Sequence, residues 1–144
     1  MRVTDKLISD IRSALPGLEL HENEPMSAHC SFRIGGPARL MACPASGEEA
    51  AALLRLLREA DAPVELMGKG TNLLVADEGL DAVVVRMGEA LSGAELLPGG
   101  RVRAGAGISL AKLAVFAAEA GLSGLEFAHG IPGSLGGAVF MNAG

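Results

Sequence analysis

Residues 121–144 read GLSGLEFAHGIPGSLGGAVFMNAG, and no other stretch of the chain says more about its fold. Seven of these 24 residues are glycine, yet the residues between them are too apolar for a flexible linker. Glycines spaced through an apolar run are typical of backbone that turns sharply or lets a ligand approach closely. Because the stretch carries almost no charge, we expect it to hold a phosphate-bearing, partly aromatic cofactor through backbone N–H groups, hydroxyls and shape.

A second glycine-rich segment, GKGTN at residues 68–72, lies between apolar segments that we predict to be strands, 64–67 and 73–75. Successive backbone N–H groups in such a turn can form a concave anion-binding site. The segment is not a Rossmann fingerprint, because Leu73 occupies the third glycine position and a strand follows. It is not a Walker A loop either, because Lys69 lies between the two glycines. An ordinary turn and a phosphate-binding loop remain equal alternatives on this spacing alone.

Composition narrows the classes of function. A chain of 144 residues is about one domain, and a hydrophobic fraction of 49% predicts a buried core. A net charge of −5, with no Trp or Tyr, argues against a nucleic-acid-binding surface. No apolar run approaches the roughly 20 residues of a membrane span, and the charged N-terminus is unlike a signal peptide. We therefore expect a cytoplasmic protein that binds neither nucleic acid nor membrane.

The residues most often used in catalysis and metal binding are few. Cys30 and Cys43 are too few for a structural zinc site and are expected to be small apolar side chains in a reducing compartment. His29 and His129 have no second ligand at metal spacing. No pair of residues has the pattern of a nucleophile and its base, so we predict neither a metal site nor a catalytic residue.

Hydrophobic periodicity predicts an α+β fold rather than a doubly wound sheet. Thr4, Ser46 and Ser109 are expected to cap three helices, and residues 21–28 to be irregular. The helices are expected at 5–15, 48–60 and 110–120, and further strands at 39–43, 82–87, 94–97 and 101–104. A change of composition at residues 88–93 predicts three parts: a lead-in (1–22), a first lobe (23–88) and the start of a second lobe (89–144).

Four segments together resemble the UDP-N-acetylenolpyruvoylglucosamine reductases, also called UDP-N-acetylmuramate dehydrogenases. They occur in the family's order: NEPMSAHCSFRIGGPA (23–38), MGKGTNLLVADEGL (67–80), AGAG (104–107) and the glycine-rich stretch at 121–144. The resemblance implies a two-lobed FAD-binding domain of the vanillyl-alcohol-oxidase/PCMH type, incomplete at its C-terminus. It also implies that FAD is held noncovalently between the lobes.

Carried over by position, residues 68–73 are implied to wrap the FAD pyrophosphate, while residues of the last segment lie along the rest of the cofactor. Thr71 stands where the family usually has serine, and Cys30 stands where threonine is usual. The implied cofactor-binding residues are Gly68, Lys69, Gly70, Thr71, Asn72, Leu73, Gly130, Pro132, Gly133, Ser134, Gly137 and Gly144.

The resemblance implies a monomeric, NADPH-dependent enzyme that reduces the small molecule enolpyruvyl-UDP-GlcNAc to UDP-N-acetylmuramate for peptidoglycan synthesis. Family members are longer, and the arginine, serine and glutamate that bind and protonate the substrate are expected beyond residue 144. Residues 1–144 alone are therefore expected to be inactive. Two alternatives remain open: a noncatalytic FAD- or nucleotide-binding module, and the flavin-binding half of another oxidoreductase of the same fold.

Overall fold

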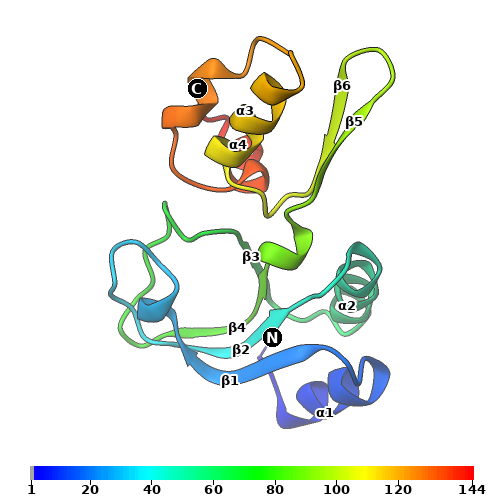
Figure 1. The fold of residues 1–144 in the computed structure, drawn as a ribbon. Helices are drawn as coiled ribbons and strands as arrows, with labels where there is room; N and C mark the ends of the chain where they lie inside the picture. Colours follow the sequence, from blue (N-terminus) through cyan, green and yellow to red (C-terminus); the bar gives the residue numbers. More distant parts are fainter. Residues whose placement is uncertain (1) are drawn as a thin grey trace.

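The computed structural model describes residues 2–144 and shows two lobes joined by a short connection (Figure 1). The first lobe combines a four-stranded sheet with two helices. Its elements are α1 (Asp5–Ala14), β1 (Glu19–Pro25), the short helix η1 (Met26–Ala28), β2 (Pro37–Cys43), α2 (Gly47–Glu59), β3 (Val64–Met67) and β4 (Leu80–Arg86). None of the helices within residues 2–144 is long and apolar enough to cross a bilayer.

The sheet has the strand order β1-β2-β4-β3. β1 pairs antiparallel with β2, whereas β2, β4 and β3 are parallel to one another. The three parallel strands therefore end, and β1 begins, at the same end of the sheet. The loop that follows β3 starts at this end, outside the carboxyl ends of the parallel strands, which is where open α/β sheets usually bind their ligands.

Capping residues explain where both helices of the first lobe begin. The Thr4 hydroxyl accepts a hydrogen bond from the Leu7 N–H, and the Ser46 hydroxyl accepts one from the Glu49 N–H, as the sequence predicted. Both helices place their apolar residues against one face of the sheet, which forms the main core. Its buried members are Val3, Leu7, Ile8, Ile11, Leu18, Leu40, Ala42, Leu53, Leu57, Val83 and Val85.

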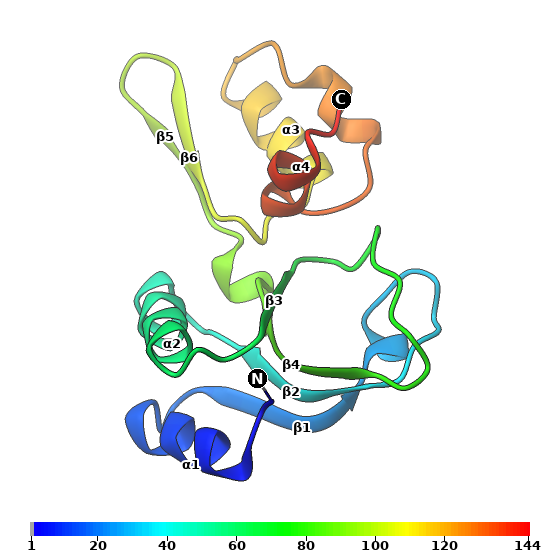
Figure 2. The same cartoon turned by 180° about the vertical axis from the view of Figure 1, so that it is seen from behind.

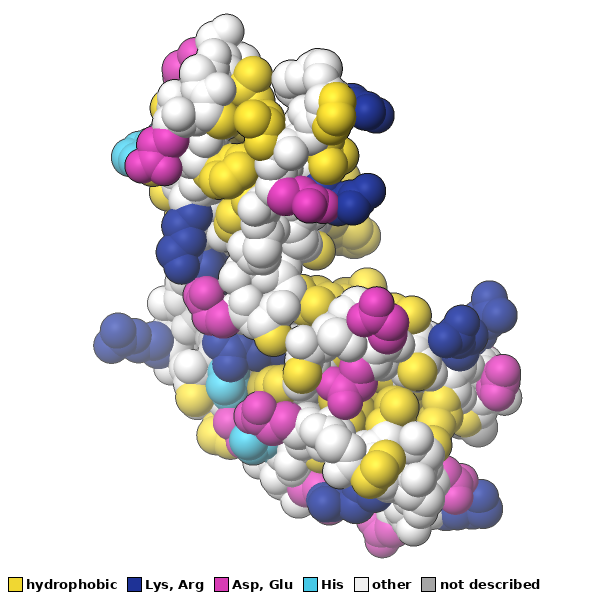
Figure 3. All heavy atoms as spheres, turned by 45° about the vertical axis from the view of Figure 1, so that its right-hand side comes forward, with side chains coloured by type: hydrophobic (Ala, Val, Ile, Leu, Met, Phe, Trp, Pro, Cys, Tyr) yellow, Lys and Arg dark blue, Asp and Glu magenta, His cyan; other side chains and the backbone are white. Residues whose placement is uncertain are grey.

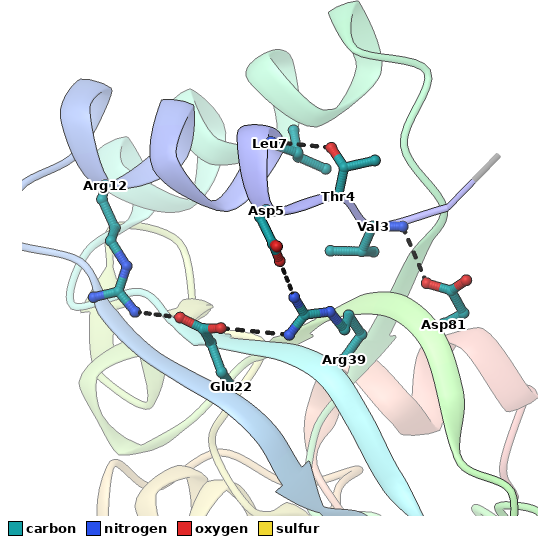
Figure 4. A network of polar contacts seen from close by, with 8 residues as sticks. All are labelled: Val3, Thr4, Asp5, Leu7, Arg12, Glu22, Arg39 and Asp81. Carbon is teal, nitrogen blue, oxygen red and sulfur yellow. Dashed lines mark hydrogen bonds and ion pairs between the residues drawn. The ribbon is translucent and has the colours of Figure 1, made fainter.

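Ion pairs outside this core link α1 to the sheet (Figure 4). Arg39 of β2 pairs with Asp5 at the start of α1, and also with Glu22 of β1. Glu22 in turn accepts a hydrogen bond of 2.8 Å from Arg12, near the end of α1. Such partly exposed pairs contribute little energy each, about 0–1 kcal/mol. Their role is to fix the orientation of the helix rather than to stabilise the lobe.

The second lobe is smaller and more loosely packed. Its elements are the hairpin β5 (Ala94–Leu97) and β6 (Arg101–Ala104), the helix α3 (Leu110–Glu119), the short helix η3 (Glu126–Gly130) and α4 (Leu135–Met141). Ser109 caps α3, and Gly121 follows it with a φ of +72°, as expected for a C-terminal glycine. The buried cluster here contains Leu110, Ala114 and Ala128, and Ile108, Leu113 and Ala117 are also buried in this lobe. Figure 2 shows the hairpin standing to one side of the helices.

The connection between the lobes packs closely against the turn that precedes α3. It contains the short helix η2 (Glu89–Leu91). A Cβ on Gly105 would lie 2.0 Å from the Leu91 carbonyl oxygen, and one on Gly107 would lie 2.3 Å from the Gly88 carbonyl oxygen. The Gly107 N–H donates to the Leu91 carbonyl at 3.0 Å. These contacts explain why the AGAG segment requires its glycines.

Two predictions about local structure are wrong, and one helix was not predicted. Residues 21–28 were expected to be irregular, but 19–25 form β1, an edge strand whose mostly polar residues give no apolar alternation. Residues 73–75 were expected to be a strand, but they are irregular backbone, and Leu73 and Val75 pack into the second core cluster without strand pairing. Residues 135–141 form the helix α4, and this helix leaves Val139 and Phe140 exposed.

Candidate cofactor-binding site

The two glycine-rich segments, one from each lobe, lie against each other. A Cβ added to Gly68 would lie only 2.0 Å from the Ser134 hydroxyl oxygen. A Cβ on Gly133 would lie 3.1 Å from the Thr71 hydroxyl oxygen. In Figure 2 the green loop that follows β3 reaches toward the second lobe. The structure thus brings together two segments that are more than 60 residues apart in the sequence.

The loop at residues 68–72 has unused hydrogen-bond donors. Within residues 2–144, none of its five backbone N–H groups donates a hydrogen bond to another protein group. Gly70 lies in the left-handed region with a φ of +64°, and the side chains of Lys69 and Asn72 are exposed. Consecutive free N–H groups around a left-handed residue make a concave site for an anion. The donors present therefore fit a phosphate or pyrophosphate group.

Contacts beneath the loop hold this conformation. The Gly70 carbonyl accepts a hydrogen bond from the Ser31 N–H at 3.0 Å, and a Cβ on Gly70 would lie 2.2 Å from the His29 carbonyl oxygen. On the other side, Leu73 packs against a second core cluster that includes Met26 and Met41. Glycine is thus required at position 70 by the neighbouring backbone and by its positive φ.

Cys30 and His29 lie beneath the loop and pack against it. Their positions could not be predicted from the sequence. Cys30 is buried, and its thiol donates to the Ile34 carbonyl, with a sulfur-to-oxygen distance of 3.2 Å. It therefore supplies a hydrogen-bond donor, as a threonine hydroxyl at this position would. The His29 ring nitrogen Nε2 lies 2.7 Å from the Glu24 carboxylate, which fixes the orientation of the ring.

The segment from the second lobe differs, because three consecutive N–H groups in it, those of Leu135, Gly136 and Gly137, are already bonded. The N–H of Leu135 donates to the Ile108 carbonyl at 2.8 Å, and that of Gly136 to the Ala106 carbonyl at 2.9 Å. The Ser134 hydroxyl is buried and caps α4 by accepting from the Gly137 N–H at 3.4 Å. The hydroxyl oxygen thus accepts a hydrogen bond within the protein, while its O–H is still able to donate, so the part of Ser134 in cofactor binding stays a prediction.

The remaining predicted positions lie farther from this contact between the lobes. Gly130 ends η3, Pro132 is exposed in the next turn, and Gly144 follows α4. A Cβ on Gly130 or on Gly144 would meet nothing within 4 Å. The structure thus joins residues 68–72 to Gly133 and Ser134, while Gly130 and Gly144 have no such close neighbours. Their part in cofactor binding stays a prediction.

Two hollows in the second lobe lie away from this contact. One, of about 490 Å³, lies between the hairpin and α3 and is lined by Ala94, Ile108 and Phe116 among others. The other, of about 180 Å³, lies between α3 and η3. Figure 3 shows hydrophobic side chains exposed on this lobe. Neither hollow is lined by residues of the 68–72 loop, so neither enlarges the candidate site.

Comparison with known proteins agrees with the fold and indicates an FAD-binding domain. The family model described as an FAD binding domain matches residues 38–144. The UDP-N-acetylenolpyruvoylglucosamine reductase of Heliobacterium modesticaldum is 53% identical over 123 residues, which cover 85% of this chain and 39% of that protein. The chain spans less than half the length of curated relatives such as this one.

Solved structures support the same fold. The crystal structure of UDP-N-acetylenolpyruvylglucosamine reductase from Thermus caldophilus matches with a TM-score of 0.62 and 37% identity, over 88% of this chain and 42% of that one. The BBE-like 1 protein of Physcomitrella patens, at 17% identity, shares the fold with a TM-score of 0.58, over 79% of this chain and 26% of its own. These matches show that the chain is a member of the FAD binding domain family and has the two-lobed α+β fold of the vanillyl-alcohol-oxidase/PCMH type.

Proposed function

We propose that this chain is the FAD-binding part of a UDP-N-acetylenolpyruvoylglucosamine reductase that acts in peptidoglycan precursor synthesis. One observation carries the proposal: a loop whose five N–H groups have no acceptor among the described residues meets the glycine-rich segment of the other lobe. The relatives that bear this enzyme's name match nearly the whole chain, which supports the proposal. The enzyme uses NADPH to reduce the small molecule enolpyruvyl-UDP-GlcNAc, in the cytoplasm and as a monomer.

The chain's own residues bind and orient the cofactor. The N–H groups of residues 68–72 receive the FAD pyrophosphate, the Thr71 hydroxyl adds a donor, and Lys69 adds positive charge. Leu73 anchors this loop to the core beneath it. On the second lobe, Pro132, Gly133, Ser134, Gly137 and Gly144 shape the surface beside the rest of the cofactor, with Gly130 preceding them. Binding is noncovalent.

Bound FAD supplies the hydride-transfer chemistry, since flavins carry reducing equivalents that protein side chains cannot. The role of the described residues is to place the cofactor between the lobes. Free N–H groups suit this task because they hold a phosphate without carrying charge themselves, so orientation is set by the fixed backbone.

The identity of the cofactor is the first test. The intact protein is purified, its flavin is released by mild denaturation, and the flavin is identified by chromatography. We expect FAD, because a loop that binds a pyrophosphate requires the dinucleotide. FMN, or an intact protein without flavin, would contradict the proposal. Since this chain has no Trp or Tyr, flavin fluorescence can be followed with little interference from it.

The activity is the second test. We expect the intact flavoprotein to oxidise NADPH only when enolpyruvyl-UDP-GlcNAc is present. A protein that binds FAD stoichiometrically but shows no such turnover would instead be a noncatalytic module or a part of another oxidoreductase. This outcome would overturn the proposed reaction and leave the proposed cofactor site intact.

A further inference from the structure

Three side chains with metal-binding atoms lie close together at the end of the sheet where β1 begins and β2 ends. Glu19 and Cys43 are directly paired across the two antiparallel strands, and His21 lies two residues from Glu19 on the same face. One ligand atom from each residue, a carboxylate oxygen, an imidazole nitrogen and the thiol sulfur, lies within 4.8 Å of the other two. Two of these atoms, Nε2 of His21 and Oε1 of Glu19, are only 2.7 Å apart.

This donor set suits a borderline metal ion. Zinc in proteins is bound by thiolate, imidazole and carboxylate groups, at distances of about 2.0–2.3 Å and in tetrahedral geometry. Oxygen-preferring ions such as Mg²⁺ and Ca²⁺ do not favour a sulfur ligand. Ligands on two paired strands are held in register by the backbone hydrogen bonds of the sheet. We propose that Glu19, His21 and Cys43 form a zinc-binding site, with water as the fourth ligand.

Charged groups of both signs lie near the thiol. Burial raises the pKa of Cys43, as do the carboxylates of Glu19 and Glu24, while the nearby guanidinium of Arg86 lowers it. A bound zinc ion would replace the thiol proton and offset both carboxylates.

The proposed zinc site is separate from the cofactor loop. Both lie at the same end of the sheet, where the parallel strands finish. Across the sheet, however, β4 lies between β2, which carries Cys43, and β3, which leads into the loop. Two strand spacings separate them, about 10 Å. Glu19 is exposed, while His21 and Cys43 are half-buried, so an ion can reach the site from solvent. The proposal is therefore independent of whether FAD binds.

Cobalt(II) is a direct probe, because a thiolate bound to this ion gives an intense charge-transfer absorption in the near ultraviolet. We expect the intact, reduced protein to bind one equivalent of Co²⁺ with this absorption, and Zn²⁺ to displace it. Zinc affinity is then measured by competition with a chromogenic chelator. Cys43→Ser and His21→Gln should each weaken zinc binding by more than about 100-fold, beyond the usual loss from removing an outer-shell partner.

Matched controls are the other cysteine and another histidine, Cys30→Ser and His129→Gln, which should leave zinc affinity unchanged. Thermal unfolding without metal checks that each variant is folded. Lack of the thiolate absorption in the unmodified protein would overturn the proposal without reference to any variant. Zinc binding that survives in folded Cys43→Ser, or that disappears in Cys30→Ser, would also overturn it.

Discussion

The loop at residues 68–72 and the segment at 133–137 are both rich in glycine, yet they use their backbone N–H groups in opposite ways. In the first, five N–H groups have no acceptor within residues 2–144. In the second, the N–H groups that begin α4 bond to the Ala106 and Ile108 carbonyls and to the Ser134 hydroxyl. Glycine content alone therefore does not identify an anion site. What matters is whether the neighbouring elements supply acceptors.

Gly70→Val is the substitution that we expect to have the largest effect on the loop at residues 68–72. Its backbone φ of +64° disfavours a β-branched residue, and its Cβ would lie 2.2 Å from the His29 carbonyl oxygen. We expect the free energy of unfolding to fall by more than about 2 kcal/mol and FAD affinity to fall by more than about tenfold. Chemical denaturation and FAD titration of the apo protein measure the two effects.

Two controls separate the causes. Gly99→Val in the hairpin has a similar φ, +79°, but nothing within 4 Å of its Cβ, so it reports backbone strain without the clash. Lys69→Ala removes the loop's charge and leaves its backbone intact; we expect a smaller loss of FAD affinity than for Gly70→Val. A larger loss for Lys69→Ala would show that the loop binds through charge, contrary to this account.

The next largest effect is expected from Gly68→Ala, which places a methyl group against Ser134 at the contact between the lobes. Overpacking of this kind costs about 1–3 kcal/mol, and we expect FAD affinity to fall by about tenfold. Adding Ser134→Gly removes the atoms that the methyl group meets. FAD titration of the double variant should show a partial recovery relative to Gly68→Ala. Additive losses would mean that this contact does not position the cofactor loop.

Ser134→Ala is expected to act on stability more than on binding. It removes the cap of α4, which costs about 1 kcal/mol, while the N–H groups of residues 68–72 remain free. Ser109→Ala removes the equivalent cap from α3 and serves as the matched control. Denaturation should show similar losses for both variants. If Ser134→Ala loses FAD affinity as strongly as Gly68→Ala, its hydroxyl contacts the cofactor.

Cys30→Thr should have the smallest effect. The thiol already donates to the Ile34 carbonyl, and a threonine hydroxyl would make a similar but stronger bond. We expect the stability to change by less than about 1 kcal/mol and FAD affinity to stay within about twofold. A large loss in either measurement would show that the buried site cannot accommodate the branched side chain.

Much of the fold could be predicted from the sequence because its signals are local. Thr4, Ser46 and Ser109 cap the three predicted helices, and the 94–104 hairpin turns at its glycines. β1 could not be predicted, since its side chains are mostly polar and only pairing with β2 defines it. α4 was missed because its glycines have low helix propensity, whereas tertiary bonds to residues 106 and 108 fix its first turn.

For the candidate site, the sequence predicted the two segments and not how they would meet. Their glycines and apolar residues are visible along the chain, but the contact of Gly68 with Ser134 depends on the arrangement of two lobes. The support of Gly70 by His29 and Cys30 is equally non-local. The same holds for Glu19, His21 and Cys43, because strand register rather than sequence spacing brings them together. Along the sequence, Cys30 and Cys43 are too few for a structural zinc site and His29 and His129 have no second ligand at metal spacing, so no metal site was predicted.

Whether the free N–H groups of residues 68–72 bind FAD can be measured by backbone amide NMR of the intact apo protein during titration with FAD. We expect the signals of residues 68–72 to shift most, because their N–H groups gain an acceptor. The signals of Leu135 and Gly136 should shift less, since their N–H groups keep the Ile108 and Ala106 carbonyls as acceptors. FAD binding that leaves the amide signals of residues 68–72 unshifted would show that this loop is not the cofactor site.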